Sequence, residues 1–272
     1  MKKRMLAILC ILCVLLLSGC GLDATAPDST TSTPTTAVAP QKTSFEVVNE
    51  ALEKTDSLNS MNMEMQMNIS ISMAGQTIEM PMTVICKAKD LQGSNPVIQS
   101  QVSTSILGQT TQFDMYQEGN WAYITTQGQS FKADISGDNP YDQTGTAESI
   151  MMDLPEELLN GLPMILNADG SQTLTITIPN ETFAEIYGDM LSSINSTSGI
   201  GSATSLNIQD ATVKITVYNG YIREYSMNFV MAMTVTGIET SSSVTASVLF
   251  HDPGQDVVIT PPAGYQNFPE MG

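Results

Sequence analysis

The sequence predicts an α+β domain built on one large curved antiparallel sheet, a half-open β-barrel of about 10–11 strands covered by a few helices. The first observation is residues 61–73, where every odd position is Met or Ile and every even position is polar. This period of two is typical of a strand with one buried face. The second is a series of further alternating segments, two of them separated by Asn219-Gly220, a strong signal for a β-hairpin turn. Strands joined by short turns are antiparallel, and the helical patterns between them complete the α+β class.

The first 19 residues are predicted to be a lipoprotein signal peptide. A basic start at residues 2–4 precedes an unbroken apolar run of 13 residues, Met5 to Leu17. The run is too short to span a membrane, which needs roughly 20 apolar residues. Leu17-Ser18-Gly19-Cys20 resembles the bacterial lipobox, and this resemblance implies cleavage before Cys20 and a diacylglyceryl group on its sulfur. An ordinary secretion signal cleaved near Gly19 is the alternative.

We expect residues 20–42 to be the lipidated cysteine and a disordered tether, and residues 43–272 to be a single domain. The tether is rich in Thr, Ser and Pro and has no apolar period. Two acyl chains give stable membrane anchoring, so the expected location is extracytoplasmic, lipid-anchored to the cell membrane, as in Gram-positive surface lipoproteins.

Net charge narrows the classes of partner. The whole chain has a formal net charge of −18. Loss of Lys2, Lys3 and Arg4 with the signal peptide leaves seven basic and 28 acidic residues, which gives the mature chain a formal net charge of −21. Nucleic-acid binding needs clustered Lys and Arg, so it is excluded. Solubility is the simplest interpretation of this charge. Cys86 is the one cysteine left in the domain, and we expect it to be a small buried hydrophobe on a strand face.

The domain is predicted to begin with a helix from Ser44, as its cap, to about Leu58. A long hairpin follows, in which residues 61–73 and 78–86 are joined by Ala74-Gly75-Gln76. Pro81 predicts an edge or a bulge in the second strand. The remaining expected elements are strands over 96–107, 110–117, 121–127 and 130–135, a loop over 138–145, helical pieces over 148–166 broken at Pro155 and Pro163, a strand over 172–178, a helix from Pro179-Asn180 to Ile194, a loop over 199–205, and strands over 207–218, 221–237, 241–251 and 257–260.

No catalytic constellation is found in the sequence, so we expect neither an enzyme nor a cofactor or metal. His251 is the single histidine, and no G-x-S-x-G motif supplies a nucleophile for it. Zinc needs several Cys or His ligands, and no Gly-rich phosphate loop is present. The acidic stretches 134–142 and 167–170 do not match the twelve-residue calcium loop, so ordinary turns explain them.

Methionine is the unusual component, because the chain has 18 and many lie on predicted strand faces. Sheets usually prefer Val and Ile, whereas methionine is common on adaptable apolar binding surfaces. Three interpretations remain open: plain core packing, the lining of a site for an apolar ligand such as an acyl chain, and Cu(I) capture by Met63 and Met65 facing Met80 and Met82. The candidate ligand-contact residues are Met63, Met65, Met67, Ile69, Met80, Met82, Val84, Met115, Trp121, Met227, Phe229, Met231 and Met233. Trp121, with Tyr116, Tyr123 and Phe131 near the same hairpin, either covers a core or clamps a ligand.

The pattern resembles the LolA-type lipoprotein-carrier fold and related mycobacterial envelope lipoproteins. The resemblance is carried by Leu58-Asn59-Ser60 leading into a long strand, by residues 115–121 (MYQEGNW), and by residues 257–262 (VVITPP). The resemblance covers most of residues 43–268 and includes no diagnostic motif. Within this group the sequence is most similar to Gram-positive surface lipoproteins of unassigned function. The resemblance implies a half-open barrel whose helices, near 151–166 and 183–194, cover a cavity that carries lipids in several members.

These observations give a leading hypothesis and two alternatives. The leading hypothesis is a membrane-anchored lipoprotein that binds a hydrophobic or lipid-like molecule in the concave face of its sheet. The first alternative is a non-enzymatic structural or interaction module of the cell envelope with a packed core, and the second is a Met-rich Cu(I)-binding lipoprotein. The expected partners are the membrane, through the lipid on Cys20, and a small hydrophobic molecule.

Overall fold

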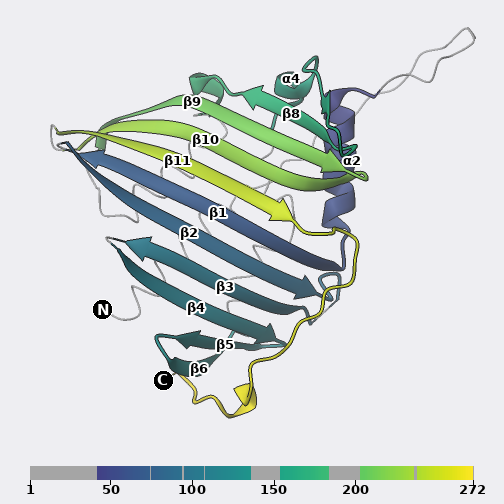
Figure 1. Ribbon diagram of the computed structural model, residues 1–272, viewed down its shortest axis with the longest axis vertical. Coiled ribbons are helices and arrows are strands. Elements are labelled where there is room, and N and C mark those ends of the chain that lie inside the picture. Colours follow the sequence, from purple (N-terminus) through teal and green to yellow (C-terminus); the bar gives the residue numbers. More distant parts are fainter. Residues whose placement is uncertain are drawn as a thin grey trace, which may run out of the picture.

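The chain folds around one open antiparallel sheet of eleven strands in the order β6-β5-β4-β3-β2-β1-β11-β10-β9-β8-β7 (Figure 1). The computed structural model describes residues 42–73, 75–93, 95–106, 108–135, 154–183, 203–235 and 238–271. Its elements are α2 (Ser44–Asp56), β1 (Ser60–Met73), β2 (Gln76–Lys89), β3 (Val97–Ile106), β4 (Gln109–Glu118), β5 (Trp121–Thr126), β6 (Gln129–Asp134), α4 (Glu156–Leu159), β7 (Ile165–Leu166), β8 (Gln172–Thr177), β9 (Ala203–Tyr218), β10 (Tyr221–Val235), β11 (Ile238–Phe250) and η1 (Tyr265–Asn267). This architecture confirms the predicted fold class.

The predicted N-terminal hairpin is present as β1 and β2. Met73 pairs with Gln76, so the connection has two residues, where three were predicted. Gly75 has a φ of +80°, a conformation that glycine adopts without steric cost. The pairing of β2 with β3 starts at Met82, so Pro81, which has no N–H to donate, lies just outside that ladder. The β1–β2 register is unbroken at Pro81, so the structure has no bulge there.

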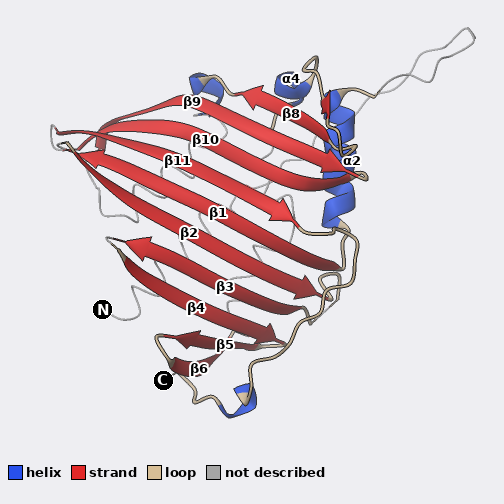
Figure 2. Ribbon diagram, viewed as in Figure 1, coloured by secondary structure: helices blue, strands red, loops and turns tan. Residues whose placement is uncertain are grey.

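The two halves of the sheet meet at its centre, where β1 pairs with β11 (Figure 2). Strands β1 to β6 form a meander on one side, and β11 back to β7 form the other. Met63 lies opposite Phe250, so the first strand and the last strand are neighbours.

The sheet has a dry face and a wet face. We call the face that carries Met63 and Met65 the inner face, and the opposite face the outer face. Helix α2 packs on β9 and β10, with Val48 and Ala51 buried in a core on the inner face. The outer face of the central strands carries mainly Ser, Thr, Asn and Gln, as the polar positions of β1 predict.

The N-cap of helix α2 lies one residue earlier than predicted. Thr43 is the N-cap, and a capping box joins it to Glu46. Ser44, the predicted cap, instead donates a hydrogen bond to the carbonyl oxygen of Leu162 and so ties the helix to the segment after α4. An N-cap residue such as Thr43 contributes about 1 kcal/mol to helix stability.

The C-terminal segment after β11, residues 251–271, runs along the strand ends toward β6 (Figure 1). We call it the strap. The main-chain N–H of Lys132 in β6 donates to the carbonyl oxygen of Pro269, and the N–H of Met271 donates to the carbonyl oxygen of Lys132. The strap thereby occupies part of the free edge of β6. The predicted strand over 257–260 is wrong, because these residues make no ladder.

Other predicted boundaries shift, and some predictions cannot be compared. Strand β9 starts at Ala203, inside the segment predicted as a loop. Of the helical pieces predicted over 148–166, α4 is present, but residues 160–166 are not helical, because Pro163 interrupts the segment and Ile165 and Leu166 form β7. Of the helix predicted from Pro179-Asn180 to Ile194, the first turn at residues 180–183 is described. The loop over 138–145 and most of the helix to Ile194 lie outside the described residues.

Candidate functional site

The inner face of β1 and β2 gathers seven of the predicted ligand-contact residues. Residues directly opposite each other in an antiparallel pair project from the same face. The register pairs Met65 with Val84, Met67 with Met82 and Ile69 with Met80, and Met63 faces Cys86. This group, which we call the methionine face, therefore forms two adjacent columns of side chains. These seven residues share one surface, whereas a ligand for them stays a prediction.

The predicted residues of β10 lie on the same face, two strands away. Through β11, Met65 is connected to Val248, which faces Tyr225 of β10. Met227 and Phe229 of β10 are buried, and the Phe229 ring lies 5.2 Å from the Phe183 ring. Met231 packs against the same core, and the side chain of Met233 lies outside the described part of the chain.

Met115 continues the methionine face into β4, because Cys86 faces Ser100 of β3 and Ser100 faces Met115. Trp121 does not join it. In β5, Ala122 faces Gln117 of β4 on the inner face, so its neighbour Trp121 points to the outer face. There the ammonium group of Lys132 lies 4.6 Å from the Trp121 ring.

Tyr116 and Tyr123 also lie on the outer face, where the strap covers them. The Tyr265 ring of the strap lies 5.1 Å from the Tyr116 ring and 4.7 Å from the Tyr123 ring, both edge to face. The Tyr265 hydroxyl donates to the Glu118 carboxylate at 2.8 Å. Tyr116 is consequently buried, and this burial raises the pKa of its hydroxyl. Tyr116 and Tyr123 thus pack beneath the strap, whereas Phe131 faces Ile124 on the inner face.

The packing on the inner face differs from one half to the other. Toward α2 the side chains of Leu174, Ile176, Val213 and Ile215 are at most 1% exposed. On the methionine face Met67, Met82 and Val84 are buried, and the other four side chains are half-buried. The half with branched residues is a closed core, and the methionine face is more open.

Gln117 is a candidate that the sequence analysis missed. It lies on the inner face between Ile98 of β3 and Ala122 of β5, and it is 1% exposed. Its Oε1 atom has no hydrogen-bond partner among the described residues. A buried acceptor of this kind costs about 1–3 kcal/mol unless a partner fills it. Gln117 has the same parity in β4 as Phe113 and Met115, and this pattern was the available signal.

Cys86 lies at one end of the methionine face, opposite Met63, and its side chain is half-buried, so it is less buried than the sequence predicted. It is a free cysteine, and desolvation of its thiol raises the pKa to about 12. The thiolate is the reactive form, so this thiol is inert at neutral pH.

The register changes the copper hypothesis. The arrangement in which Met63 and Met65 face Met80 and Met82 is wrong, because the two-residue turn places them opposite Cys86 and Val84. Within the described β1–β2 hairpin, Met67 and Met82 are the one directly opposed methionine pair. Among the described residues, no group of three or more His, Cys, Asp or Glu side chains is placed to hold a metal ion.

A cavity of about 790 Å³ opens beside the N-terminus of α2. Its apolar wall includes Val47, Leu162, Met164 and Val217, and its polar rim includes Lys42. The apolar residues also pack against the closed core. This volume lies within the range of small-molecule sites. None of the predicted ligand-contact residues lines it.

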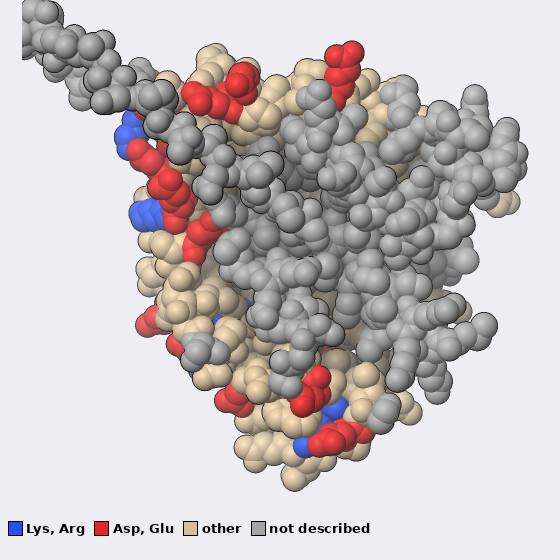
Figure 3. Space-filling model, turned by 180° about the vertical axis from the view of Figure 1, so that it is seen from behind, with Lys and Arg blue, Asp and Glu red and all other residues tan. Residues whose placement is uncertain are grey.

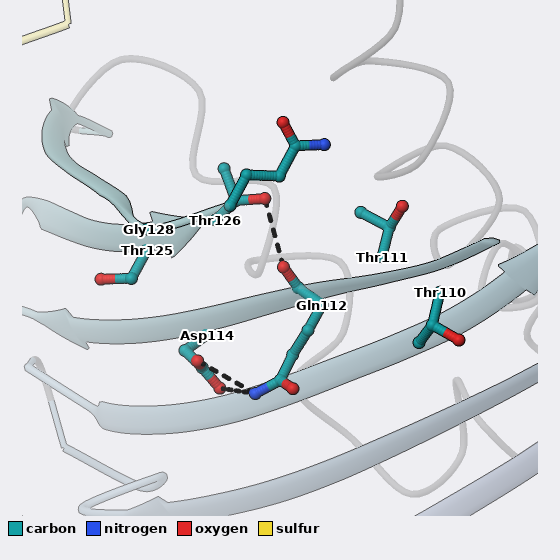
Figure 4. A pocket seen from close by; sticks show the side chains of 8 residues that line it. Thr110, Thr111, Gln112, Asp114, Thr125, Thr126 and Gly128 are labelled. Atoms are coloured by element: carbon teal, nitrogen blue, oxygen red, sulfur yellow. Dashed lines mark hydrogen bonds between the residues drawn. The ribbon is translucent and has the colours of Figure 1, made fainter.

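A second cavity, of about 340 Å³, lies between the β3–β4 turn and the β5–β6 turn (Figure 4). Its lining is polar throughout: Thr110, Thr111, Gln112, Asp114, Thr125, Thr126, Gln127 and Gly128. The Thr126 hydroxyl donates to the main-chain oxygen of Gln112, and the Gln112 amide donates to the Asp114 carboxylate at 3.2 Å. These hydrogen bonds pair the polar groups of the lining with one another.

His251, the single histidine, lies after β11 with its Nε2 atom 3.6 Å from the Glu64 carboxylate. Both side chains are partly exposed on the outer face, away from the two cavities. Seen from behind, Asp and Glu side chains are spread along the rim of the molecule with few Lys or Arg among them (Figure 3). In the part of the chain that the structure describes, no helix is long and apolar enough to cross a membrane.

Comparison with known proteins gives one family match and several distant structures. The model of DUF6612, a family of unknown function, matches residues 43–252. No curated protein matches the chain. The structure of LprF from Mycobacterium bovis aligns at 12% identity over 80% of this chain and 96% of its own, with a TM-score of 0.40.

Two further structures align at lower scores. A DUF1329 family protein from Desulfovibrio piger aligns at 12% identity over 79% of this chain and 96% of its own, with a TM-score of 0.24. A LolA superfamily protein from Nitrosomonas europaea aligns at 9% identity over 80% and 96%, with a TM-score of 0.22. Scores this low carry no conclusion about function, which has to come from the chain's own geometry.

Proposed function

From its geometry we propose that this chain, which belongs to the DUF6612 family of unknown function, is a membrane-anchored extracytoplasmic protein that binds an apolar or amphiphilic molecule. The ligand would lie on the methionine face of the sheet, and the protein would hold it without catalysing a reaction. The observation that carries the proposal is the contrast within one continuous inner face between a closed core of branched residues and a half-buried surface of methionines.

Methionine suits this role because its side chain is unbranched, flexible and polarizable. A surface of such side chains adapts to apolar molecules of different shape at little cost. A core needs no such adaptability, and β8 and β9 accordingly present Leu, Ile, Val and Ala on this face. Strand β10 adds Met227 and Phe229 to the same core. The choice of residue thus follows the proposed division between packing and binding.

Gln117 supplies a polar contact on this apolar surface. Its buried Oε1 atom is an acceptor without a partner among the described residues. Ala88 and Ala122, which lie on the same face beside Ile98 and Gln117, are small and buried. A ligand hydroxyl or amide N–H would satisfy the Gln117 oxygen. The proposed ligand is therefore an amphiphile with at least one hydrogen-bond donor next to its apolar part.

Membrane anchoring is proposed from the leader. The basic start, the 13-residue apolar run and the lipobox-like Leu17-Ser18-Gly19-Cys20 support lipidation of Cys20. Mass spectrometry of the membrane fraction tests this step. We expect a mature N-terminus at Cys20 with a diacylglyceryl adduct, and Cys20→Ala to release the protein from membranes.

The ligand is tested by native mass spectrometry of residues 21–272, followed by solvent extraction. We expect co-purifying apolar molecules that dissociate in organic solvent. A protein that is uniformly free of ligand after mild purification, and that binds no fluorescent fatty acid, would support a packed structural module instead.

Gln117→Leu sharpens the test, because the substitution removes the buried acceptor and keeps a similar volume. We expect the ligand-free protein to gain about 1 kcal/mol or more in unfolding free energy. The affinity for a hydroxylated ligand should fall about tenfold, and the affinity for a plain hydrocarbon should stay unchanged. Gln101→Leu on the outer face is the matched control, and it should leave both affinities unaltered.

A further inference from the structure

An exposed apolar run lies at the edge of the sheet beside α2. Residues 162–166 read Leu-Pro-Met-Ile-Leu, five apolar residues in succession. Ile165 is 61% exposed and Leu166 is 71% exposed. Consecutive exposed apolar residues are unfavourable in water, and they mark an interaction surface when they are present.

The run is poorly suited to pair with a strand of another protein. It contains β7, which has two residues and pairs with Thr173 and Gln172 of β8. Very short edge strands give little template for strand addition, and Pro163 has no N–H to donate. An added strand would therefore gain few hydrogen bonds here, so a partner that needs no directional bonds fits better.

The position of the run points to a lipid surface. Leu162, Pro163 and Met164 line the 790 Å³ cavity together with Lys42, the residue at which the chain enters the domain. Cys20 lies 22 residues upstream of Lys42. A flexible coil of that length spans about 25 Å. An anchor at Cys20 therefore keeps this edge of the sheet close to the bilayer.

We propose that residues 162–166 form a membrane-contact loop that places Ile165 and Leu166 in the bilayer interface, with the adjoining cavity facing the lipid. The inference rests on the anchoring part of the proposed function. It adds an orientation: the sheet meets the membrane at its β7 edge, and the strap at β6 lies at the far edge.

The charges around the loop set the preferred lipid. Glu156 and Glu157 precede it, and Asp169, which follows it, is paired with Arg223 at 2.7 Å. Lys42 at the cavity rim is paired with Glu50. The loop therefore has no net positive surroundings, and its insertion should be driven by apolar burial. Zwitterionic phosphatidylcholine is the appropriate probe.

The test uses the full lipoprotein reconstituted in phosphatidylcholine vesicles that contain brominated acyl chains. Trp121 is the single tryptophan, so the Trp121→Phe protein gives a silent background. In that background we introduce Leu166→Trp and, as the matched control, Val258→Trp on the strap, where the side chain is 80% exposed. We expect bromine to quench the indole of Leu166→Trp at least threefold more than that of Val258→Trp.

Equal, weak quenching of both indoles in vesicle-bound protein would overturn the contact loop. Failure of both variants to co-sediment with vesicles would overturn it as well, and would separately show that the anchor is absent. A second measurement covers variants that fold poorly. In the wild-type sequence, Ile165→Ser/Leu166→Ser should make the anchored domain several-fold more accessible to protease at the 162–166 loop, with an unchanged thermal midpoint. Unchanged accessibility would count against the contact.

Discussion

The two halves of the inner face differ in the side chains that build them. In β8 and β9 the face consists of Leu, Ile, Val and Ala residues that are almost fully buried, and α2 packs on β9 and β10. Strand β10 adds Tyr225, Met227 and Phe229 to this core. In β1 and β2 the equivalent positions are methionines, most of them half-buried. Branched residues have few rotamers and specify one packing, whereas methionine tolerates several. One sheet thus combines a half that fixes the fold with a half that can adapt its surface.

The largest expected difference between the halves concerns stability. Leu174→Ala in the closed core should lower the unfolding free energy by about 2–5 kcal/mol, because it leaves a cavity among fully buried neighbours. Met65→Ala, on the half-buried methionine face, should cost less than half of that. Urea denaturation monitored by circular dichroism measures both. Equal losses would mean that the methionine face is packed as tightly as the core.

The second effect concerns the outer side of the methionine half. Tyr265→Ala removes two edge-to-face contacts and the hydrogen bond to Glu118, so we expect a loss of about 1–3 kcal/mol. Hydrogen exchange should speed up in β4 to β6 and stay unchanged in β8 to β10. Gln266→Ala, an exposed position in the same turn, is the control. Uniform destabilisation of the whole sheet would contradict an independent role for the strap.

A smaller effect on stability is expected when a substitution on the methionine face changes the shape of a side chain but conserves its volume. Met65→Leu/Met82→Leu should alter the unfolding free energy by less than about 1.5 kcal/mol. It should nevertheless narrow the range of apolar ligands bound, because leucine adapts less well than methionine. A panel of fatty acids of different length, measured by fluorescence displacement, tests this range. Met227→Leu in the buried part of β10 should leave the range as it is.

The smallest effect is electrostatic and lies at the β7–β8 turn. The side-chain and main-chain hydrogen bonds from Ser171, followed by Arg223, lower the pKa of Asp169 to about 2. A carboxyl whose pKa is depressed by folding stabilises the protein above its unfolded value of 3.8, and this contribution is lost as the pH falls toward 2. NMR titration should show Asp169 ionising near 2, and Ser171→Ala should move its pKa up toward 3.8. An unshifted pKa in the variant would disprove the role of Ser171.

The sequence was sufficient to predict strands in which buried and exposed side chains alternate regularly. The alternation in residues 61–73 predicts both β1 and the face that packs inward, because apolar side chains alone occupy that face from Met61 to Ile71. The turn length was less certain, since Ala74-Gly75-Gln76 fits a loop of two or three residues. A turn one residue longer would have placed Met63 opposite Lys87 instead of Cys86.

Contacts between segments that are distant in the sequence could not be predicted from local sequence patterns. Trp121 lies near Met115 in the sequence, but adjacent strand positions alternate between faces, and the register alone assigns it to the outer side. The strap has no alternation, because it packs through Tyr265 and Phe268 and makes few ladder bonds. Gln117 was overlooked because a polar residue on a dry face contradicts the pattern that identifies the face.

The pairing of β1 with β11 has a consequence for the order in which the domain can form. Met63 in β1 pairs with Phe250 in β11, so the pairing at the centre of the sheet can form only after nearly the whole polypeptide has been synthesised. Contacts between residues so far apart in sequence form slowly. A chain that emerges from its N-terminus would therefore hold β1 to β6 as an incomplete sheet with one edge of β1 free, and only the arrival of the last strand would close it.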